Sequence, residues 1–420
     1  MKHSHIVLFI GIVSILYSLV FYYFYRRFLK PFRLKGRANI YAFAGLFIFV
    51  YSTFLPFFLM RFKKESVTTV SWIAYLFFGF IFTLFPVMVS RDSVLILFRT
   101  VKKYIFKIIL MRWIVSDDAP QDHSVQEISR REFLVKSNYA VLGFSTLVVG
   151  LGAYQARKPP RVYESKIPIA GLPDHFDGFK IVQISDIHLG LLIDGKYLSE
   201  VVRHVNELKP DLVAITGDLV DGTVSQLRSQ AAVLKDISSV HGSYFVTGNH
   251  EYYSGVEDWL VEIEKLGVKV LMNDHDIIRK AFSKNEMRSQ KQDKKNLIIA
   301  GVPDHRAGPN AGHLYEPLKA IQGANLNDIK ILLAHQPTDI DLALDAGYHL
   351  QLSGHTHGGQ FFPYNMAVPL FFRYNAGLYQ HAGQNGNHMM VYVNRGTGYW
   401  GPPLRTGVPS EISLLTLVKA

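Results

Sequence analysis

The sequence predicts an α/β domain in which two mixed sheets pack between flanking helices, preceded by an all-α membrane region. Amphipathic stretches at residues 198–208 and 256–266 alternate with short apolar runs, which indicates α/β layering. The later runs have fewer helices between them, which favours a two-sheet sandwich over one doubly wound sheet. The apolar runs, rich in Val, Ile and Leu, are typical of buried strands and lie at residues 181–185, 212–216, 243–247, 297–301, 329–334, 348–353, 389–393 and 412–418.

Residues 1–154 are predicted to form the membrane region. Three segments, residues 6–25, 40–60 and 70–89, approach the roughly 20 apolar residues that a transmembrane helix needs. A shorter and glycine-rich segment covers residues 139–154. We therefore expect about four transmembrane helices, and then a catalytic domain at residues 155–420, which is long enough for one sizeable core.

The net charge of +11 belongs to the membrane region and not to the catalytic domain. Residues 1–154 hold 19 Lys and Arg against 7 Asp and Glu, whereas residues 155–420 hold 26 against 27. Basic residues that flank apolar segments indicate membrane topology, so no nucleic-acid partner is expected. Six basic residues in 26–37 and nine in 91–138 place these two segments in the cytoplasm. The catalytic domain is then extracytoplasmic, on the outer side of the cell (inner) membrane.

Two features of the segment between the third and fourth predicted spans leave alternatives open. Residues 94–114 carry Arg99, Lys102, Lys103 and Lys107 at helical spacing, which predicts an interfacial helix on anionic headgroups or a soluble packed helix. Arg130-Arg131 followed by Phe133-Leu134 resembles a twin-arginine export signal, or is an ordinary cytoplasmic basic flank. Both interpretations of the arginine pair put the catalytic domain on the same side of the membrane.

Polar residues with metal-binding side chains follow five of the apolar runs. Carboxyl ends of strands are where ligands bind in open α/β sheets. The chain has no cysteine, so thiolate sites are excluded, and oxygen and imidazole donors suit Mn, Fe, Zn or Mg. The pattern therefore predicts a hydrolytic site with two divalent metal ions, and its residues are Asp186, His188, Asp218, Asn249, His250, His335, His355 and His357.

These motifs, which include Gly248-Asn249-His250-Glu251 and Gly354-His355-Thr356-His357, occur in the order found in one known superfamily. From about residue 180 to its end the chain resembles the calcineurin-like metallophosphoesterases, in particular their membrane-associated (YkuE/YaeI-like) branch. The resemblance implies that Asp186, His188 and His357 bind the first metal ion and that Asp218 bridges the two ions. It implies that the second ion is bound by Asn249, His335 and His355.

The resemblance also implies how such a site would act. Two cations about 3.5–4 Å apart can clamp the attacking and leaving oxygens, and a water between them loses a proton to give the hydroxide nucleophile. His250 would be the catalytic residue that stabilises phosphoryl charge or protonates the leaving oxygen. Glu251 would orient His250 or lie at the surface. Arg395 and Arg405 would bind substrate phosphate or anchor their loops.

We therefore expect a membrane-anchored metal-dependent phosphoesterase that cleaves phosphodiester or pyrophosphate bonds. A substrate in or near the bilayer, such as a phospholipid or a lipid-linked pyrophosphate, and a soluble phosphodiester both fit a tethered enzyme. The alternatives are a non-catalytic metal-binding scaffold and a regulatory module of a membrane complex or transporter. The sequence leaves open the natural substrate, mono- or diester preference, the metals, protein partners and the oligomeric state. The polar stretch 274–296 is expected to be a solvated, mobile loop between two strands, with a lipid-headgroup contact as the alternative.

Overall fold

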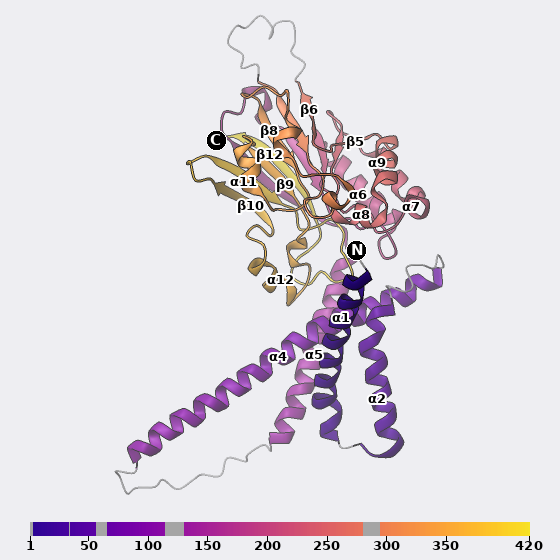
Figure 1. Cartoon of the computed structure of the whole chain (residues 1–420), viewed down its shortest axis with the longest axis vertical. Helices are drawn as coiled ribbons and strands as arrows, with labels where there is room; N and C mark the ends of the chain where they lie inside the picture. The colour runs from indigo at the N-terminus through magenta and orange to yellow at the C-terminus, as the bar shows by residue number, and fades with distance from the viewer. Residues whose placement is uncertain (1–2, 33, 56–64, 114–129, 280–294) are drawn as a thin grey trace, which may run out of the picture. The chain divides into compact units, whose positions relative to one another are not determined.

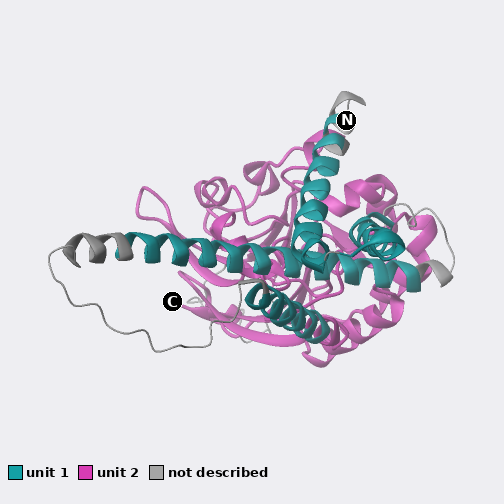
Figure 2. Ribbon diagram, turned by 90° about the horizontal axis from the view of Figure 1, so that it is seen from below, with its two compact units in different colours: residues 1–151 teal, residues 152–420 magenta. Residues whose placement is uncertain are grey.

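The computed structural model describes residues 3–32, 34–55, 65–113, 130–279 and 295–420 (Figure 1). The chain divides into two compact units, residues 1–151 and residues 152–420 (Figure 2). We call them the membrane unit and the catalytic unit. Helix α5 (Arg130–Ala156) runs from the first into the second, so its last turn is part of the catalytic unit.

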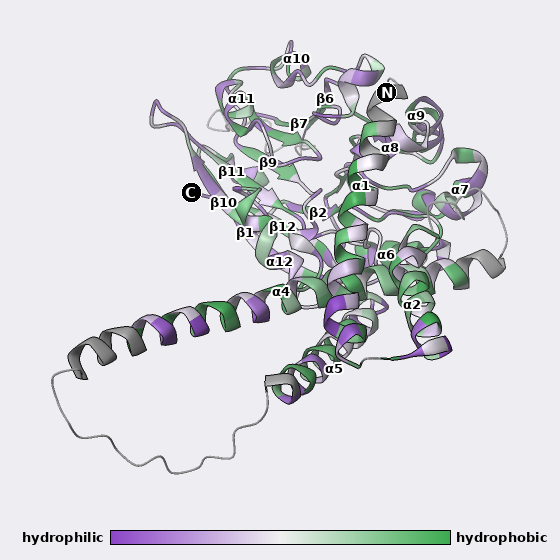
Figure 3. Ribbon diagram, turned by 60° about the horizontal axis from the view of Figure 1, so that its bottom comes forward, coloured by the Kyte–Doolittle hydropathy of each residue, from purple (hydrophilic) through white to green (hydrophobic). Residues whose placement is uncertain are grey.

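The membrane unit is helical, as predicted. It contains α1 (His3–Phe24), α2 (Gly36–Tyr51), α4 (Glu65–Trp113) and most of α5. Figure 3 shows α1 and α2 largely in the hydrophobic colour. Among the described residues, two helices are long and apolar enough to cross a membrane, Thr69–Ile105 and Glu132–Ala156. These two helices support membrane association, but the prediction of four transmembrane helices is not confirmed.

Helix α4 continues through the predicted boundary between the third span, residues 70–89, and the interfacial helix, residues 94–114. It is continuous for 49 residues and includes Arg91 and Asp92. Both charged side chains are paired: Asp92 Oδ1 lies 2.7 Å from Arg91 and Oδ2 lies 2.5 Å from Arg27. Because paired charges are tolerated in a helix bundle, they do not end the helix. Ser129 and the Arg130 and Arg131 side chains lie outside the described part of the chain.

Two six-stranded sheets form the framework of the catalytic unit, as predicted. The first has the order β1-β12-β2-β3-β4-β5 and the second β10-β11-β9-β8-β7-β6. The first sheet contains β1 (Arg161–Ile169), β2 (Lys180–Ile184), β3 (Leu212–Ile215), β4 (Ser243–Phe245), β5 (Val268–Val270) and β12 (Glu411–Lys419). The second contains β6 (Asp274–Ile278), β7 (Leu297–Gly301), β8 (Ile329–Leu333), β9 (Leu350–Ser353), β10 (Gly377–Ala382) and β11 (His388–Val393).

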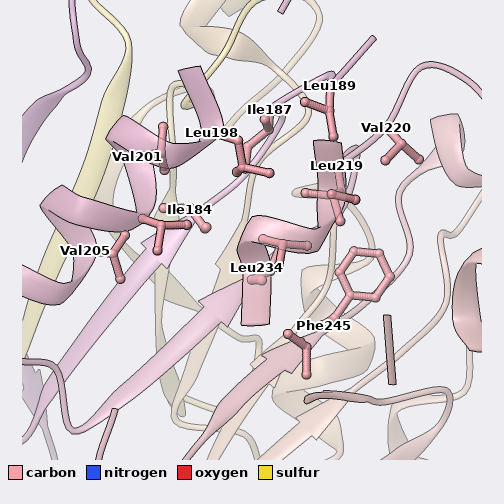
Figure 4. Packing of buried hydrophobic residues seen from close by; sticks show 14 of the residues in the cluster. Ile184, Ile187, Leu189, Leu198, Val201, Val205, Leu219, Val220, Leu234 and Phe245 are labelled. Carbon is pink, nitrogen blue, oxygen red and sulfur yellow. The ribbon is translucent and has the colours of Figure 1, made fainter. Parts of the chain in front are cut away.

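Apolar side chains fill three layers around these sheets. The layer between the sheets joins Ile181 and Leu212 of the first sheet with Ile299 and Ile331 of the second. Helices cover both outer faces (Figure 1). On the first sheet, residues such as Leu198 and Val201 pack on the strands (Figure 4). The described α-helices that follow β1 in the catalytic unit are α6 (Gly195–Glu207), α7 (Val224–Ala231), α8 (Asn249–Ser254), α9 (Val256–Lys265), α10 (Pro317–Ala320), α11 (Ile340–Asp345) and α12 (Tyr364–Ala367).

All eight predicted strands are present within one or two residues of their predicted bounds. The search for apolar runs did not find β1, β5, β6 and β10. Of these, β6 corrects the prediction of a loop from residue 274, because residues 274–278 pair with the buried strand β7. Strand β6 is polar because it lies at the edge of the second sheet. The remainder of that predicted loop, 280–294, lies outside the described residues.

Candidate metal centre

The predicted site residues lie together at the carboxyl ends of five strands. Strands β2, β3 and β4 are neighbouring and parallel in the first sheet, and β8 and β9 are neighbouring and parallel in the second. Gln183 connects the sheets near this edge, because its Nε2 donates to Thr216 Oγ1 at 2.9 Å and to the Ser353 carbonyl at 2.8 Å. The two sheets therefore present the polar residues that follow their strands to one common region.

The first donor set consists of Asp186, His188 and His357, as the family resemblance implied. Nε2 of His188 lies 3.2 Å from Nε2 of His357, and the latter lies 3.4 Å from Asp186 Oδ1. All three side chains are buried. Two imidazole nitrogens and a carboxylate oxygen that converge in this way are suited to bind one divalent cation.

The second donor set consists of Asp218, His335 and His355, whereas the resemblance implied Asn249, His335 and His355 for the second ion and Asp218 as the bridge between the ions. His335 Nε2 lies 3.1 Å from Asp218 Oδ2 and 3.2 Å from His355 Nδ1. Nδ1 of His335 lies 2.8 Å from the Thr216 carbonyl and donates its proton there, so Nε2 is the ring nitrogen that faces the second set. Burial lowers the pKa of His335, but Asp218 outweighs burial and raises this pKa well above its usual value, so a cation that binds here would displace the Nε2 proton.

Asn249 supplies an independent test of whether this region suits a metal ion. Its Oδ1 is buried and has no hydrogen-bond partner among the residues that the structure describes. A buried amide oxygen without a partner is destabilising by about 1–3 kcal/mol. A bound cation would satisfy this oxygen, so Asn249 fits the metal centre that the donor sets indicate.

Asp218 lies between the two donor sets. Its Oδ1 accepts a hydrogen bond from the backbone N–H of His250 at 2.8 Å. Its Oδ2 lies 3.1 Å from His335 Nε2 in the second set and 3.9 Å from His188 Nε2 in the first. One carboxylate oxygen therefore faces both sets, which is the position that a bridging ligand needs.

The backbone at the site is strained, which the sequence did not indicate. Five of the seven predicted metal ligands have positive φ angles: Asp186 (53°), His188 (55°), Asp218 (50°), His355 (70°) and His357 (50°). Each such non-glycine residue costs about 1–3 kcal/mol and persists only where the surroundings hold it. The turns after β2, β3 and β9 therefore aim these side chains at a cost in stability, as is common at functional sites.

Glycines make the close approach of these turns feasible. A Cβ atom on Gly354 would lie 2.0 Å from Ser185 Oγ and 2.2 Å from Asp186 Oδ2. A Cβ atom on Gly217 would lie 2.5 Å from the Gly248 nitrogen and 2.8 Å from His335 Nδ1. The glycine in each motif is thus required by the packing of one ligand-bearing turn against another.

His250 is held by Asp221, a residue that the motif analysis missed. Nδ1 of His250 lies 2.5 Å from Asp221 Oδ1, and Nδ1 of His188 lies 3.2 Å from the same oxygen. Asp221 thereby fixes the orientation of both rings and leaves the Nε2 atom of His250 directed to the site, 4.0 Å from Asp218 Oδ2. The position of Asp221, three residues after Asp218 in Gly217-Asp218-Leu-Val-Asp221, was the available signal.

Neighbouring charges oppose the effect of burial on the pKa of His250 and add to it for His355 and His357. Burial lowers the pKa of His250, but Asp218 and then Asp221 raise it to about 9. Burial and then the charge of His335 lower the pKa of His355 to about 3. Burial and then Arg405 hold the pKa of His357 well below its usual value. His355 and His357 are therefore neutral near pH 7, as metal ligands must be.

Glu251 neither orients His250 nor lies at the surface, in contrast to both expectations. It is fully buried. Its carboxylate accepts hydrogen bonds from four backbone N–H groups, those of Asp218 (3.0 Å), Leu219 (2.7 Å), Val220 (3.3 Å) and Gly248 (2.7 Å). Glu251 therefore ties the turn after β3 to the start of α8, and so holds Asp218 and Asn249 in position.

Replacing Glu251 by alanine is expected to lower the free energy of unfolding by about 3–5 kcal/mol, because four buried N–H groups lose their acceptor. Denaturation of the full chain in detergent micelles, followed by circular dichroism, measures this change. Glu264→Ala is the matched control, since Glu264 is exposed on the neighbouring helix α9. Equal stability of the two variants would contradict the anchoring role.

Arg395 and Arg405 both make contacts within their loops, which are the contacts that the anchoring role requires. Arg405 is fully buried, and its guanidinium donates to the carbonyls of Arg395, Gly396, His357 and Gly398. Arg395 donates to Glu411 at 2.6 Å, and its guanidinium lies 4.7 Å from the ring centre of Tyr163. Because the Arg405 donors are already engaged, the geometry favours a structural role for Arg405 over phosphate binding, and Glu411 holds Arg395 through Nη1.

Comparison with known proteins places this site in a family. Residues 179–359 match the model of the calcineurin-like phosphoesterases. A transmembrane protein with metallophosphoesterase domain from Danio rerio is 39% identical over 274 residues, which are 64% of this chain and 60% of that protein. An uncharacterized metallophosphoesterase of Campylobacter jejuni is 30% identical over 97% of both chains. The uncharacterized metallophosphoesterase YkuE of Bacillus subtilis is 32% identical over 70% of this chain and 99% of its own.

The chain spans 60% of the length of the Danio rerio relative and 64% of a similarly named Bos taurus relative, which is 39% identical. By contrast, its match to the Campylobacter jejuni protein includes nearly all of both sequences. The matched residues 179–359 contain all eight polar residues that the sequence predicted for the site. The chain therefore belongs to the calcineurin-like phosphoesterases.

Proposed function

We propose that this protein is a membrane-anchored phosphoesterase whose site holds two divalent metal ions. The observation that carries the proposal is the pair of donor sets with Asp218 Oδ2 directed at a histidine of each, together with the buried and unpartnered Asn249 oxygen. Asp186, His188, Asp218 and His357 would hold one ion. The other would be held by Asp218, Asn249, His335 and His355.

The residues of the site have separate tasks in this proposal. When bound, the two ions would supply the hydroxide nucleophile and neutralise the phosphate oxygens. Asp218 would contribute its carboxylate to both donor sets. His250, positioned by Asp221, would donate a proton from Nε2 to the leaving oxygen or stabilise charge on the phosphoryl group. Family membership and the donor chemistry support hydrolysis of a phosphodiester or a pyrophosphate.

Measuring bound metal together with hydrolysis tests this function. The full chain in detergent micelles is expected to bind about two divalent ions and to hydrolyse bis(p-nitrophenyl) phosphate or p-nitrophenyl phosphate. Chelation should abolish hydrolysis, and Mn²⁺, Fe²⁺, Zn²⁺ or Mg²⁺ should restore it. Full activity in metal-depleted protein would overturn the proposal. Comparing the two esters determines whether mono- or diesters are preferred.

We also propose four membrane crossings with the catalytic unit outside the cytoplasm. Two helices apolar enough to span, the names of the vertebrate relatives and the basic segments 26–37 and 91–138 support it. Reporter fusions after Lys64 and at Ala420 should both report the extracytoplasmic side. A cytoplasmic signal at Ala420 would overturn this orientation.

A metal-binding scaffold without catalysis is the second candidate for the same fold. A scaffold needs no positioned acid beside its metal ligands. Here the 2.5 Å contact between His250 and Asp221 provides one. Metal binding without hydrolysis of any phosphate ester would establish the scaffold instead.

A further inference from the structure

Large apolar side chains are exposed on one loop of the catalytic unit. Within residues 361–372, which include α12, the exposed fractions are 52% for Tyr364, 67% for Met366, 82% for Leu370 and 78% for Phe371. Trp400, on a second loop, is 50% exposed. Single exposed apolar residues are ordinary, but a cluster of them indicates a surface that contacts a partner or a membrane. We call these five residues the apolar rim.

The two loops of the apolar rim are bonded to each other. Gln360 Nε2 donates to the carbonyls of Trp400 and Pro402, both at 3.0 Å, and its Oε1 accepts from the Trp400 N–H at 2.9 Å. The Asn365 side chain approaches the second loop as well, because a Cβ atom on Gly407 would lie 3.3 Å from Asn365 Nδ2. The rim therefore belongs to one connected surface.

The apolar rim borders the metal centre. The ring centre of Trp400 lies 5.6 Å from that of His250, edge to face. Phe372, at the end of the first loop, lies 5.7 Å from His355 between ring centres. His250 is the proposed acid and His355 belongs to the second donor set, so the rim flanks the reacting region.

The second loop is also joined to the end of a helix that is apolar enough to span a membrane. The N–H of Arg405 donates to the Gly152 carbonyl in the last turns of α5 at 3.0 Å. A Cβ atom on Gly152 would lie 2.3 Å from Thr406 Oγ1, so the helix and the loop are in close contact. Nearby, Lys158 Nζ lies 4.4 Å from the ring centre of the exposed Tyr154. An aromatic and basic pair at the end of an apolar helix is typical of the membrane–water interface.

We propose that the apolar rim inserts into the surface of the bilayer in which α5 is anchored, and that it brings the metal centre to phosphoesters at headgroup depth. The proposed occupant of the rim is thus a lipid bilayer surface. Aromatic and aliphatic side chains that enter the headgroup region gain free energy by leaving water, and α5 limits their distance from it. This inference rests on the proposed phosphoesterase function, and it makes a membrane phosphoester the substrate class.

Insertion is tested without reference to activity. Because the chain has no cysteine, Leu370→Cys can be labelled at one position with an environment-sensitive fluorophore. In full-length protein reconstituted into phosphatidylglycerol and phosphatidylethanolamine vesicles, nitroxide-bearing lipids should quench this label. Leu326→Cys is the control, since Leu326 is 88% exposed and precedes β8, at the end opposite the metal centre. Equal quenching at the two positions, or none at 370, would overturn the proposal.

Delivery of the substrate is tested with two esters that share one scissile bond. The first is phosphatidyl-p-nitrophenol in vesicles, and the second is the soluble methyl p-nitrophenyl phosphate. Leu370→Ser/Phe371→Ser should lower kcat/KM at least tenfold on the first and no more than about threefold on the second. Leu318→Ser/Leu326→Ser is the matched control and should change neither. Equal losses on both esters, or no loss on the lipid ester, would overturn the delivery role.

The two tests separate this inference from the proposed function. If the wild-type protein hydrolyses neither ester, the phosphoesterase proposal fails, and quenching at residue 370 still decides whether the rim inserts. If both esters are hydrolysed and the label at 370 stays in water, the insertion of the rim is wrong and the phosphoesterase function stands.

Discussion

Replacing Asp218 by asparagine is expected to lower kcat/KM for phosphoester hydrolysis by more than about 100-fold. In the structure Asp218 Oδ1 already accepts the N–H of His250, and Oδ2 faces His335 and His188, one from each donor set. An amide has one acceptor oxygen and one donor nitrogen. If its oxygen keeps the first contact, an N–H group points at the cations. If the amide is rotated by 180°, its NH2 group faces the N–H of His250 and neither group has an acceptor.

The same substitution should change the metal content, which is measured separately from activity. Mass spectrometry of the metals in purified protein is expected to give about two ions per chain for the wild type and one or fewer for Asp218→Asn. Asp345→Asn is the control, because Asp345 is an exposed carboxylate at the end of α11. An Asp218→Asn variant with full activity would refute the two-metal model, whatever its metal content.

The strands and their polar ends could be predicted because they depend on local pattern. Runs such as residues 297–301 are apolar throughout, and a continuous apolar run is typical of a strand buried on both faces. His335 and Asp218 directly follow such runs, and parallel strands bring their carboxyl ends to one edge. Which residues form each donor set was taken from the family resemblance, and spacing alone could not assign them.

The support of the site could not be predicted, because it depends on contacts between distant turns. Glu251 follows His250 in the sequence, and adjacency suggested a partnership that the geometry does not provide. Its side chain points away to four N–H groups, which only the folded chain brings together. The positive φ angles at Asp186 and His357 are likewise imposed by tertiary packing, since neither residue type favours this region as glycine does.

The membrane unit shows the limit of reading charges along a sequence. The predicted span ends at residue 89 and the basic segment begins at residue 91, yet α4 continues through Arg91 and Asp92. Their partners include Arg27, 65 residues away, and Asn138, 47 residues away. A charged residue can lie inside an apolar helix when a side chain from another segment pairs with its charge.

Replacing His250 by alanine is expected to lower kcat/KM by more than about 100-fold on esters with poor leaving groups, and by about tenfold on p-nitrophenyl esters. Asp221 engages Nδ1 of His250 at 2.5 Å, so Nε2 is the atom available to protonate the leaving oxygen. A p-nitrophenolate leaves without a proton, whereas a phenolate needs one. The measurement is kcat/KM for a series of aryl methyl phosphates, plotted against the pKa of the leaving phenol.

The slope of this plot distinguishes the two roles of His250. Loss of a proton donor makes the dependence on the leaving group steeper, whereas loss of charge stabilisation on the phosphoryl oxygens lowers every ester equally. Asp221→Asn should show the same steeper slope with a smaller loss, because Asp221 acts through the His250 ring. His204→Ala, which removes a partly exposed histidine of α6, should leave the slope unchanged. A parallel line for His250→Ala would assign the residue to charge stabilisation and leave another group, or water, as the proton donor.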